Sequence, residues 1–145
     1  MDKYTAYMNQ VQDQLEKALG HLAYSYKKIL NYPEDPNELN EETLESWESF
    51  CARFARVVDV FLMRYIKARV KNEDPGFEGT LRDYLNVAEK LNLIDDPKKW
   101  LALRELRNIA AHEYTDKDLK GFLHQLKMAA PELLKLKSIF STRGV

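Results

Sequence analysis

The stretch LESWESFCARFARVVDVFLMRYIKA, residues 44–68, decides the fold class of this chain. Its large apolar residues recur every three or four positions, and this spacing lines one face of an α-helix. The apolar face consists of Leu44, Trp47, Cys51, Phe54, Val58, Phe61, Tyr65 and Ala68. The stretch therefore predicts a long amphipathic helix, which the same pattern continues through Lys71.

A similar apolar stripe precedes this stretch and predicts a first long helix. The stripe consists of Tyr4, Tyr7, Val11, Leu15, Ala18, Leu22, Tyr26 and Ile29. Prolines in the segment 32–40 end this helix, because proline lacks the backbone N–H that a helix interior needs. Beyond Lys71, the segment NEDPGFEG at 72–79 has the glycine and proline content of a turn.

Three further helical patterns follow the turn. Each begins with residues that favour a helix start, namely Thr80, Asp96-Pro97 and Thr115-Asp116. Pro131 is expected to kink or restart the last helix before 133–140. No segment alternates between apolar and polar residues as a strand would. The sequence therefore predicts an all-α fold, an up-and-down bundle of about five helices, in one domain that spans residues 1–145.

The composition fits one globular domain and excludes several classes of protein. Of the 145 residues, 45% are hydrophobic and 31% are charged, a balance typical of a folded chain rather than a disordered one. The single cysteine, Cys51, excludes an intramolecular disulfide and a multi-cysteine metal site. Neither an apolar leader nor a run of about 18 apolar residues occurs, so we expect a cytoplasmic protein without a membrane span.

The charge is balanced overall but uneven along the chain. The 22 basic and 23 acidic residues give a formal charge of −1, so no overall positive field favours nucleic acid. Residues 31–52 nevertheless carry seven acids and no base, whereas residues 53–71 carry six bases and one acid, Asp59.

Two interpretations of these charge runs stay open. The acids and bases can complement the dipole of the second helix, with acids at its amino end and bases at its carboxyl end. Alternatively, the acidic run faces a partner protein and the basic run binds RNA phosphates. The basic residues that this second interpretation uses are Arg53, Arg56, Arg64, Lys67 and Arg69.

One segment, RNIAAHEY at residues 107–114, carries residues suited to chemistry. On an ideal helix, Arg107 and Tyr114 lie almost one above the other, whereas His112 lies about 140° around the axis from Arg107. A straight helix therefore does not direct all three side chains to one point. Either the helix distorts or ends near 111–113, or a second copy of the segment completes the site.

These residue types suit metal-independent cleavage of a phosphodiester. A histidine in the last turn of a helix can move protons to or from a 2′-hydroxyl or a leaving oxygen. Arg107 can bind the phosphate with two donors, and Asn108 can orient either group. Tyr114 can donate to a phosphate oxygen or stack on a base. The same side chains can instead do no more than brace the end of a helix, and this purely structural interpretation also stays open.

The segment 107–114 resembles the signature of the HEPN superfamily, late in an all-helical chain of this size. More narrowly, it is similar to small HEPN proteins that are paired with minimal nucleotidyltransferases. These are described both as HepT-type toxins and as nucleotidyltransferase substrate-binding subunits. The resemblance implies a helical bundle that forms a homodimer, in which two copies of the motif face one cleft.

The resemblance also implies an activity and a partner. The activity is that of an endoribonuclease toxin that needs neither metal nor cofactor, with Arg107 and His112 catalytic and Asn108 assisting. The partner is a minimal nucleotidyltransferase that neutralises the toxin by binding it, or by transferring AMP to Tyr114. The added bulk and negative charge would then exclude RNA phosphate. The alternative is a non-catalytic substrate-binding or regulatory subunit of a nucleotidyltransferase.

Overall fold

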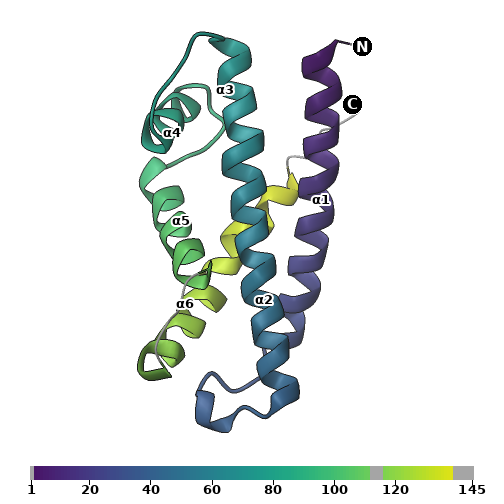
Figure 1. Cartoon of the computed structure of the whole chain (residues 1–145), viewed down its shortest axis with the longest axis vertical. Coiled ribbons are helices and arrows are strands. Elements are labelled where there is room, and N and C mark those ends of the chain that lie inside the picture. Colours follow the sequence, from purple (N-terminus) through teal and green to yellow (C-terminus); the bar gives the residue numbers. More distant parts are fainter. Residues whose placement is uncertain (1, 112–115, 139–145) are drawn as a thin grey trace.

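The chain folds as an all-α bundle, as the sequence predicts (Figure 1). The computed structural model describes residues 2–111 and 116–138, and no strand occurs within these two ranges. The α-helices are α1 (Lys3–Ile29), α2 (Glu41–Asp59), α3 (Lys67–Glu73), α4 (Leu81–Lys90), α5 (Pro97–Ala111) and α6 (Asp116–Leu134). Shorter helical segments are η1 (Pro36–Glu38), η2 (Val60–Ile66) and η3 (Lys135–Lys137).

The segments α2, η2 and α3 form one continuous rod that lies beside α1 (Figure 1). The backbone keeps right-handed helical angles at Asp59 and at Lys67, so the helix does not break at either junction. The predicted long helix over residues 44–71 is therefore confirmed. Within it, η2 has the wide turns of a π-helix, in which each N–H bonds five residues back rather than four. The sequence pattern did not predict this widening.

The helix starts follow the local capping signals. The side chain of Thr80 accepts a hydrogen bond from the N–H of Asp83, whose carboxylate accepts one from Thr80 N–H in return. Asp96 caps the start of α5, because its Oδ1 accepts from the N–H of Lys98 at 3.0 Å. Both predicted starts are therefore confirmed. The predicted start at Thr115 lies outside the described residues.

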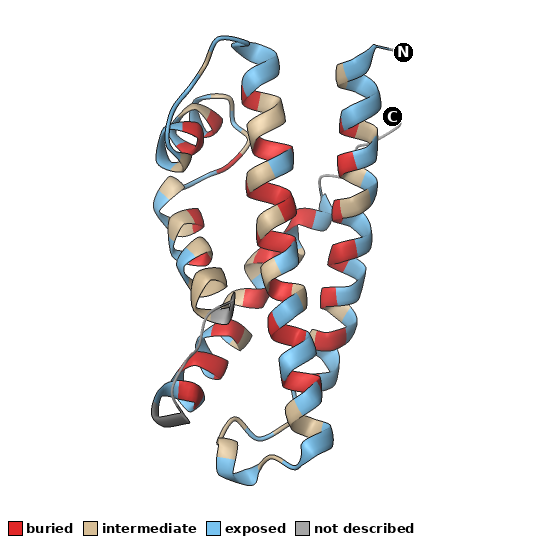
Figure 2. Cartoon of the chain, viewed as in Figure 1, coloured by how far each residue is buried: buried red, intermediate tan, exposed pale blue. Residues whose placement is uncertain are grey.

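The core lies between the α2–α3 rod and the helices packed around it (Figure 2). Aromatic side chains fill the interior, and the ring centroids of Phe61 and Trp100 are 4.6 Å apart. Cys51 is buried as a small apolar residue would be. One residue of the predicted first stripe differs: Tyr7 is 44% exposed, because Met8 instead takes the inward position one turn before Val11.

Of the kink or restart predicted at Pro131, the restart is wrong because the last helix continues through this residue, and the kink stays a prediction. α6 continues through Pro131 to Leu134 and then tightens into the 3-10 turn η3. Proline removes one backbone hydrogen bond from the helix. Packing on both sides of Pro131 compensates for the loss, because Leu126, Ala130 and Leu133 are fully buried.

None of the described helices is both long enough and apolar enough to cross a membrane.

Candidate functional site

Arg107 forms a two-point ion pair with Asp59. Its Nε donates to Asp59 Oδ1 at 2.6 Å, and its Nη2 donates to Asp59 Oδ2 at 2.7 Å. The pair joins α5 to the last residue of α2, across 48 positions of sequence. The two side chains are 25% and 36% exposed, so water reaches both of them. The hydrogen bonds with Asp59 raise the pKa of Arg107, which stays a cation at any physiological pH.

This ion pair lies in a surface hollow of about 710 Å³ between α2, η2 and α5. Among the residues that the structure describes, four arginines line the hollow, and Asp59 is the single carboxylate in its lining. We call this site the cationic hollow; its charged residues are Arg56, Asp59, Arg64, Arg104 and Arg107. Four guanidinium groups against one carboxylate leave a local excess of positive charge, although the chain as a whole carries −1. Such a surface attracts phosphates.

Two of these arginines are held by neighbouring side chains. Arg104 donates from Nε to Oδ1 of Asn108 at 3.3 Å, and Arg64 donates from Nη1 to Oε1 of Gln14 at 2.5 Å. The Nη1 atom of Arg104 is buried and has no hydrogen-bond partner within the described residues. Polar contacts therefore orient Arg64 and Arg104 at the hollow.

The wide turns of η2 contribute to the shape of the hollow. Asp59 precedes the first wide turn, and Val60, Met63 and Arg64 within η2 also line the hollow. A π-type turn changes the register of side chains around a helix, and such turns are frequent at functional sites. The wide turns of η2 therefore lie in the part of the rod that lines the hollow together with Arg107.

The basic run at 53–71 does not form one surface. Arg56 and Arg64 line the cationic hollow, but the other three predicted RNA contacts lie elsewhere. Lys67 lies over the ring of Tyr84, with Nζ 5.3 Å from the ring centroid, and Arg69 donates to the hydroxyl of Tyr65 at 3.2 Å. The structure therefore brings together two of the five residues expected to contact RNA.

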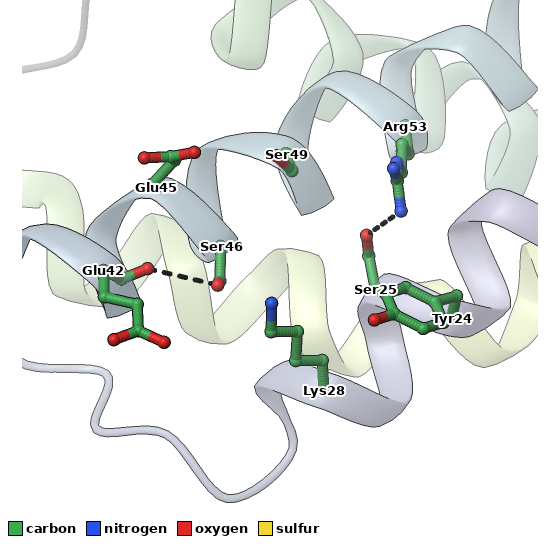
Figure 3. A pocket seen from close by; sticks show the side chains of 8 residues that line it. All are labelled: Tyr24, Ser25, Lys28, Glu42, Glu45, Ser46, Ser49 and Arg53. Carbon is green, nitrogen blue, oxygen red and sulfur yellow. Dashed lines mark hydrogen bonds between the residues drawn. The ribbon is translucent and has the colours of Figure 1, made fainter.

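Arg53 faces a different pocket, between α1 and α2 (Figure 3). Its Nη1 donates to the hydroxyl of Ser25 at 2.7 Å and to the carbonyl of His21 at 3.2 Å. Glu42 and Glu45 lie at the other end of this pocket. Arg53 therefore connects two helices and lies away from Arg107.

The ends of the α2–α3 rod carry charges that the helix dipole favours. Glu41 and Glu42 occupy the first turn of the rod, and Lys71 lies in its last turn. This arrangement supports the first interpretation of the two charge runs at the ends of the rod. Arg56 lies in the middle of the rod, where it lines the cationic hollow.

The predicted catalytic residues are only partly described. Arg107 lines the cationic hollow, and Asn108 contacts its wall through Arg104. His112 and Tyr114 lie outside the described residues, so their positions relative to Arg107 stay predictions. Among the residues that the structure describes, no group of three or more His, Cys, Asp and Glu could hold a metal ion.

The motif at 107–114 did not identify four other charged residues of the site. These are Arg56, Asp59, Arg64 and Arg104. The sequence did carry one signal for Asp59, because it is the single acid between Arg53 and Lys71. An isolated carboxylate within a basic run is a candidate partner for a buried or functional cation. Nothing in the sequence pattern identified Arg107 as that cation.

Comparison of the chain with protein-family models, with curated proteins and with solved structures found no match. The resemblance to HEPN proteins therefore depends on the motif at 107–114.

Proposed function

We propose that this protein is a metal-independent endoribonuclease of the HEPN type, the toxin of a toxin–antitoxin pair. The observation that carries the proposal is the position of Arg107 in a hollow with three further arginines. RNA presents a phosphate at every nucleotide, and affinity for it depends on such clusters of cations. The motif then supplies a histidine five residues beyond Arg107 as the group that moves protons.

The proposed reaction uses the 2′-hydroxyl of the RNA as the nucleophile. A histidine removes its proton, the 2′-oxygen attacks phosphorus, and the bond from phosphorus to the 5′-oxygen breaks. A proton returned to the 5′-oxygen completes the reaction, which leaves a 2′,3′-cyclic phosphate and a 5′-hydroxyl. Arg107 stabilises the negative charge that develops on the phosphate oxygens. Asn108 and Tyr114 assist in binding the phosphate.

The proposal includes a homodimer and a protein partner. In a dimer with two motifs at one cleft, one His112 serves as base and the other as acid. A minimal nucleotidyltransferase would inhibit the enzyme by covering the site or by attaching AMP to Tyr114. The attached phosphate would place negative charge where the RNA phosphate binds.

Incubation of purified protein with a mixed RNA pool in EDTA tests this function. We expect cleavage that leaves 2′,3′-cyclic phosphate ends and that Arg107→Ala abolishes. Products with a free 3′-hydroxyl would contradict the mechanism, because that end requires water rather than the 2′-oxygen as nucleophile. Intact RNA after incubation with folded, unmodified protein would overturn the nuclease proposal in favour of a non-catalytic nucleotidyltransferase subunit.

A further inference from the structure

We infer that Asp59 positions Arg107 for the phosphate, and that it stays bonded to Arg107 while RNA is bound. The inference rests on the proposed function, because it assigns Arg107 to an RNA phosphate. Asp59 itself touches neither the substrate nor the reacting atoms. It acts through the guanidinium that it holds.

The hydrogen bonds that Arg107 makes within residues 2–111 and 116–138 show which of its donors remain for a phosphate. A guanidinium carries five N–H donors in one plane. Asp59 accepts from Nε and from Nη2, so its two oxygens occupy one edge of that plane. Both N–H groups of Nη1 and the second N–H of Nη2 lie on the remaining edges. The parallel pair from Nη1 and Nη2 matches two phosphate oxygens.

Asp59 is selective for Arg107 among the arginines of the cationic hollow. Arg104 bonds to Asn108, and Arg64 bonds to Gln14. The pair with Arg107 has short distances at both of its contacts, and those contacts raise the pKa of Arg107. A single carboxylate thus fixes one guanidinium in orientation, while the hollow keeps its excess of positive charge.

A purely structural role explains the ion pair less well. Both side chains are partly exposed, so water screens the attraction between them and reduces the stability that the ion pair contributes. Asp59 also stands directly before the wide turns of η2, where the helix register changes at the wall of the hollow. The carboxylate is therefore placed by the fold at the surface that the ligand would use.

A positioning carboxylate has an unusual kinetic signature. Its negative charge repels the RNA phosphate, so its removal should not weaken binding. Its loss leaves the guanidinium free to rotate, and misplacement of a catalytic group slows the chemical step. Binding and catalysis should therefore change in different ways, whereas a loss of folding would reduce the amount of active enzyme.

The test compares Asp59→Asn with Glu48→Gln, which removes the same charge from an exposed position on α2. For Asp59→Asn, we expect kcat to fall about tenfold or more while KM for RNA stays the same or decreases. For Glu48→Gln, we expect neither constant to change. Unchanged kcat in Asp59→Asn, at an unchanged melting temperature, would overturn the inference.

Absence of RNA cleavage by the wild-type protein would refute the proposed function but not this inference. A second measurement therefore tests the inference without cleavage. The Nε–H of Arg107 is followed by ¹H–¹⁵N NMR and assigned with Arg107→Lys. The probe is a single-stranded DNA oligomer, which lacks the 2′-hydroxyl. We expect a distinct Nε–H signal that persists when DNA binds and disappears in Asp59→Asn. A signal that moves to the free-arginine position on DNA binding would overturn the inference, because phosphate would then displace Asp59.

Discussion

Arg104 donates from Nε to Oδ1 of Asn108, one turn further along α5, at 3.3 Å. Because the Nε of arginine can only donate, the atom of Asn108 that faces it is the carbonyl oxygen. Within the described residues, the amide NH₂ of Asn108 is then left to bind a ligand. We therefore expect Asn108 to assist the predicted chemistry as a hydrogen-bond donor, next to Arg107 in the sequence of α5.

Replacement of Asn108 by aspartate tests this donor role. The introduced carboxylate would keep the acceptor for Arg104 but lose the donor and add a negative charge near the phosphate. We expect Asn108→Asp to reduce the rate of RNA cleavage by about tenfold or more, and Asn108→Ala to reduce it less. Rates in EDTA, with melting temperatures for both variants, measure the effect. Faster cleavage by the aspartate variant than by the alanine variant would show that Asn108 is not a donor to phosphate.

The salt dependence of binding tests which basic residues contact RNA. Arg56 lines the cationic hollow, whereas Lys67 lies over Tyr84. The logarithm of the binding constant falls linearly with the logarithm of the salt concentration. For a single strand, loss of one phosphate contact should make this slope less steep by about 0.7. We expect this change for Arg56→Ala but not for Lys67→Ala, measured with an uncleavable DNA oligomer. Equal slopes in the two variants would mean that the cationic hollow is not the binding surface.

The reactivity of Cys51 reports on the core of the bundle. Burial raises the pKa of the Cys51 thiol to about 12, and the residue is 6% exposed. Since the thiolate is the reactive species, the native protein should resist alkylation by iodoacetamide at neutral pH. Unfolding in urea should make Cys51 react fully. Mass spectrometry measures the extent of alkylation over time. Rapid alkylation of the native protein would contradict the burial of Cys51.

Glu34 should contribute stability that depends on pH. Its partial burial raises the pKa, but hydrogen bonds from Lys127 at 3.3 Å and from His124 at 3.0 Å outweigh this effect and lower it overall. A carboxyl with a lowered pKa in the folded state stabilises the protein above its ordinary pKa of 4.5, and this contribution is lost at lower pH.

Urea unfolding of Glu34→Gln at two pH values measures this contribution. We expect the variant to be less stable than wild type at neutral pH by no more than about 1 kcal/mol, and equally stable near pH 3. Glu38→Gln, at an exposed position in η1, is the matched control and should have no effect at either pH. If Glu34→Gln is still less stable than wild type near pH 3, the ion pairs of Glu34 with His124 and Lys127 on α6 do not cause the loss of stability.

Local signals in the sequence predicted most of the fold. The starts of α4 and α5 depend on Thr80 and Asp96, which bond to backbone atoms within three residues. The apolar spacing likewise defined the α2–α3 rod. The wide turns of η2 were not predictable, because their residues continue the apolar spacing of an ordinary helix. Continued helix through Pro131 depends on burial of its neighbours, which is a tertiary effect.

The candidate site was predicted less completely for the same reason. The motif identified Arg107 and Asn108, but their partners come from packing rather than from spacing. Asp59 lies 48 residues from Arg107 and meets it only because α5 packs on α2. The basic run at 53–71 separates onto different surfaces, since neighbouring positions of a helix point in different directions. Charge along the sequence therefore overstated the size of the basic surface.

The most direct test of the central claim is the initial rate at which the protein cleaves RNA in EDTA, compared with His112→Ala. A mass spectrum of the same wild-type sample should confirm that Tyr114 carries no AMP, because modified protein would be inhibited. We predict cleavage by the wild type and none by His112→Ala at an unchanged melting temperature. Equal cleavage by the two proteins would contradict the assignment of the chemistry to His112.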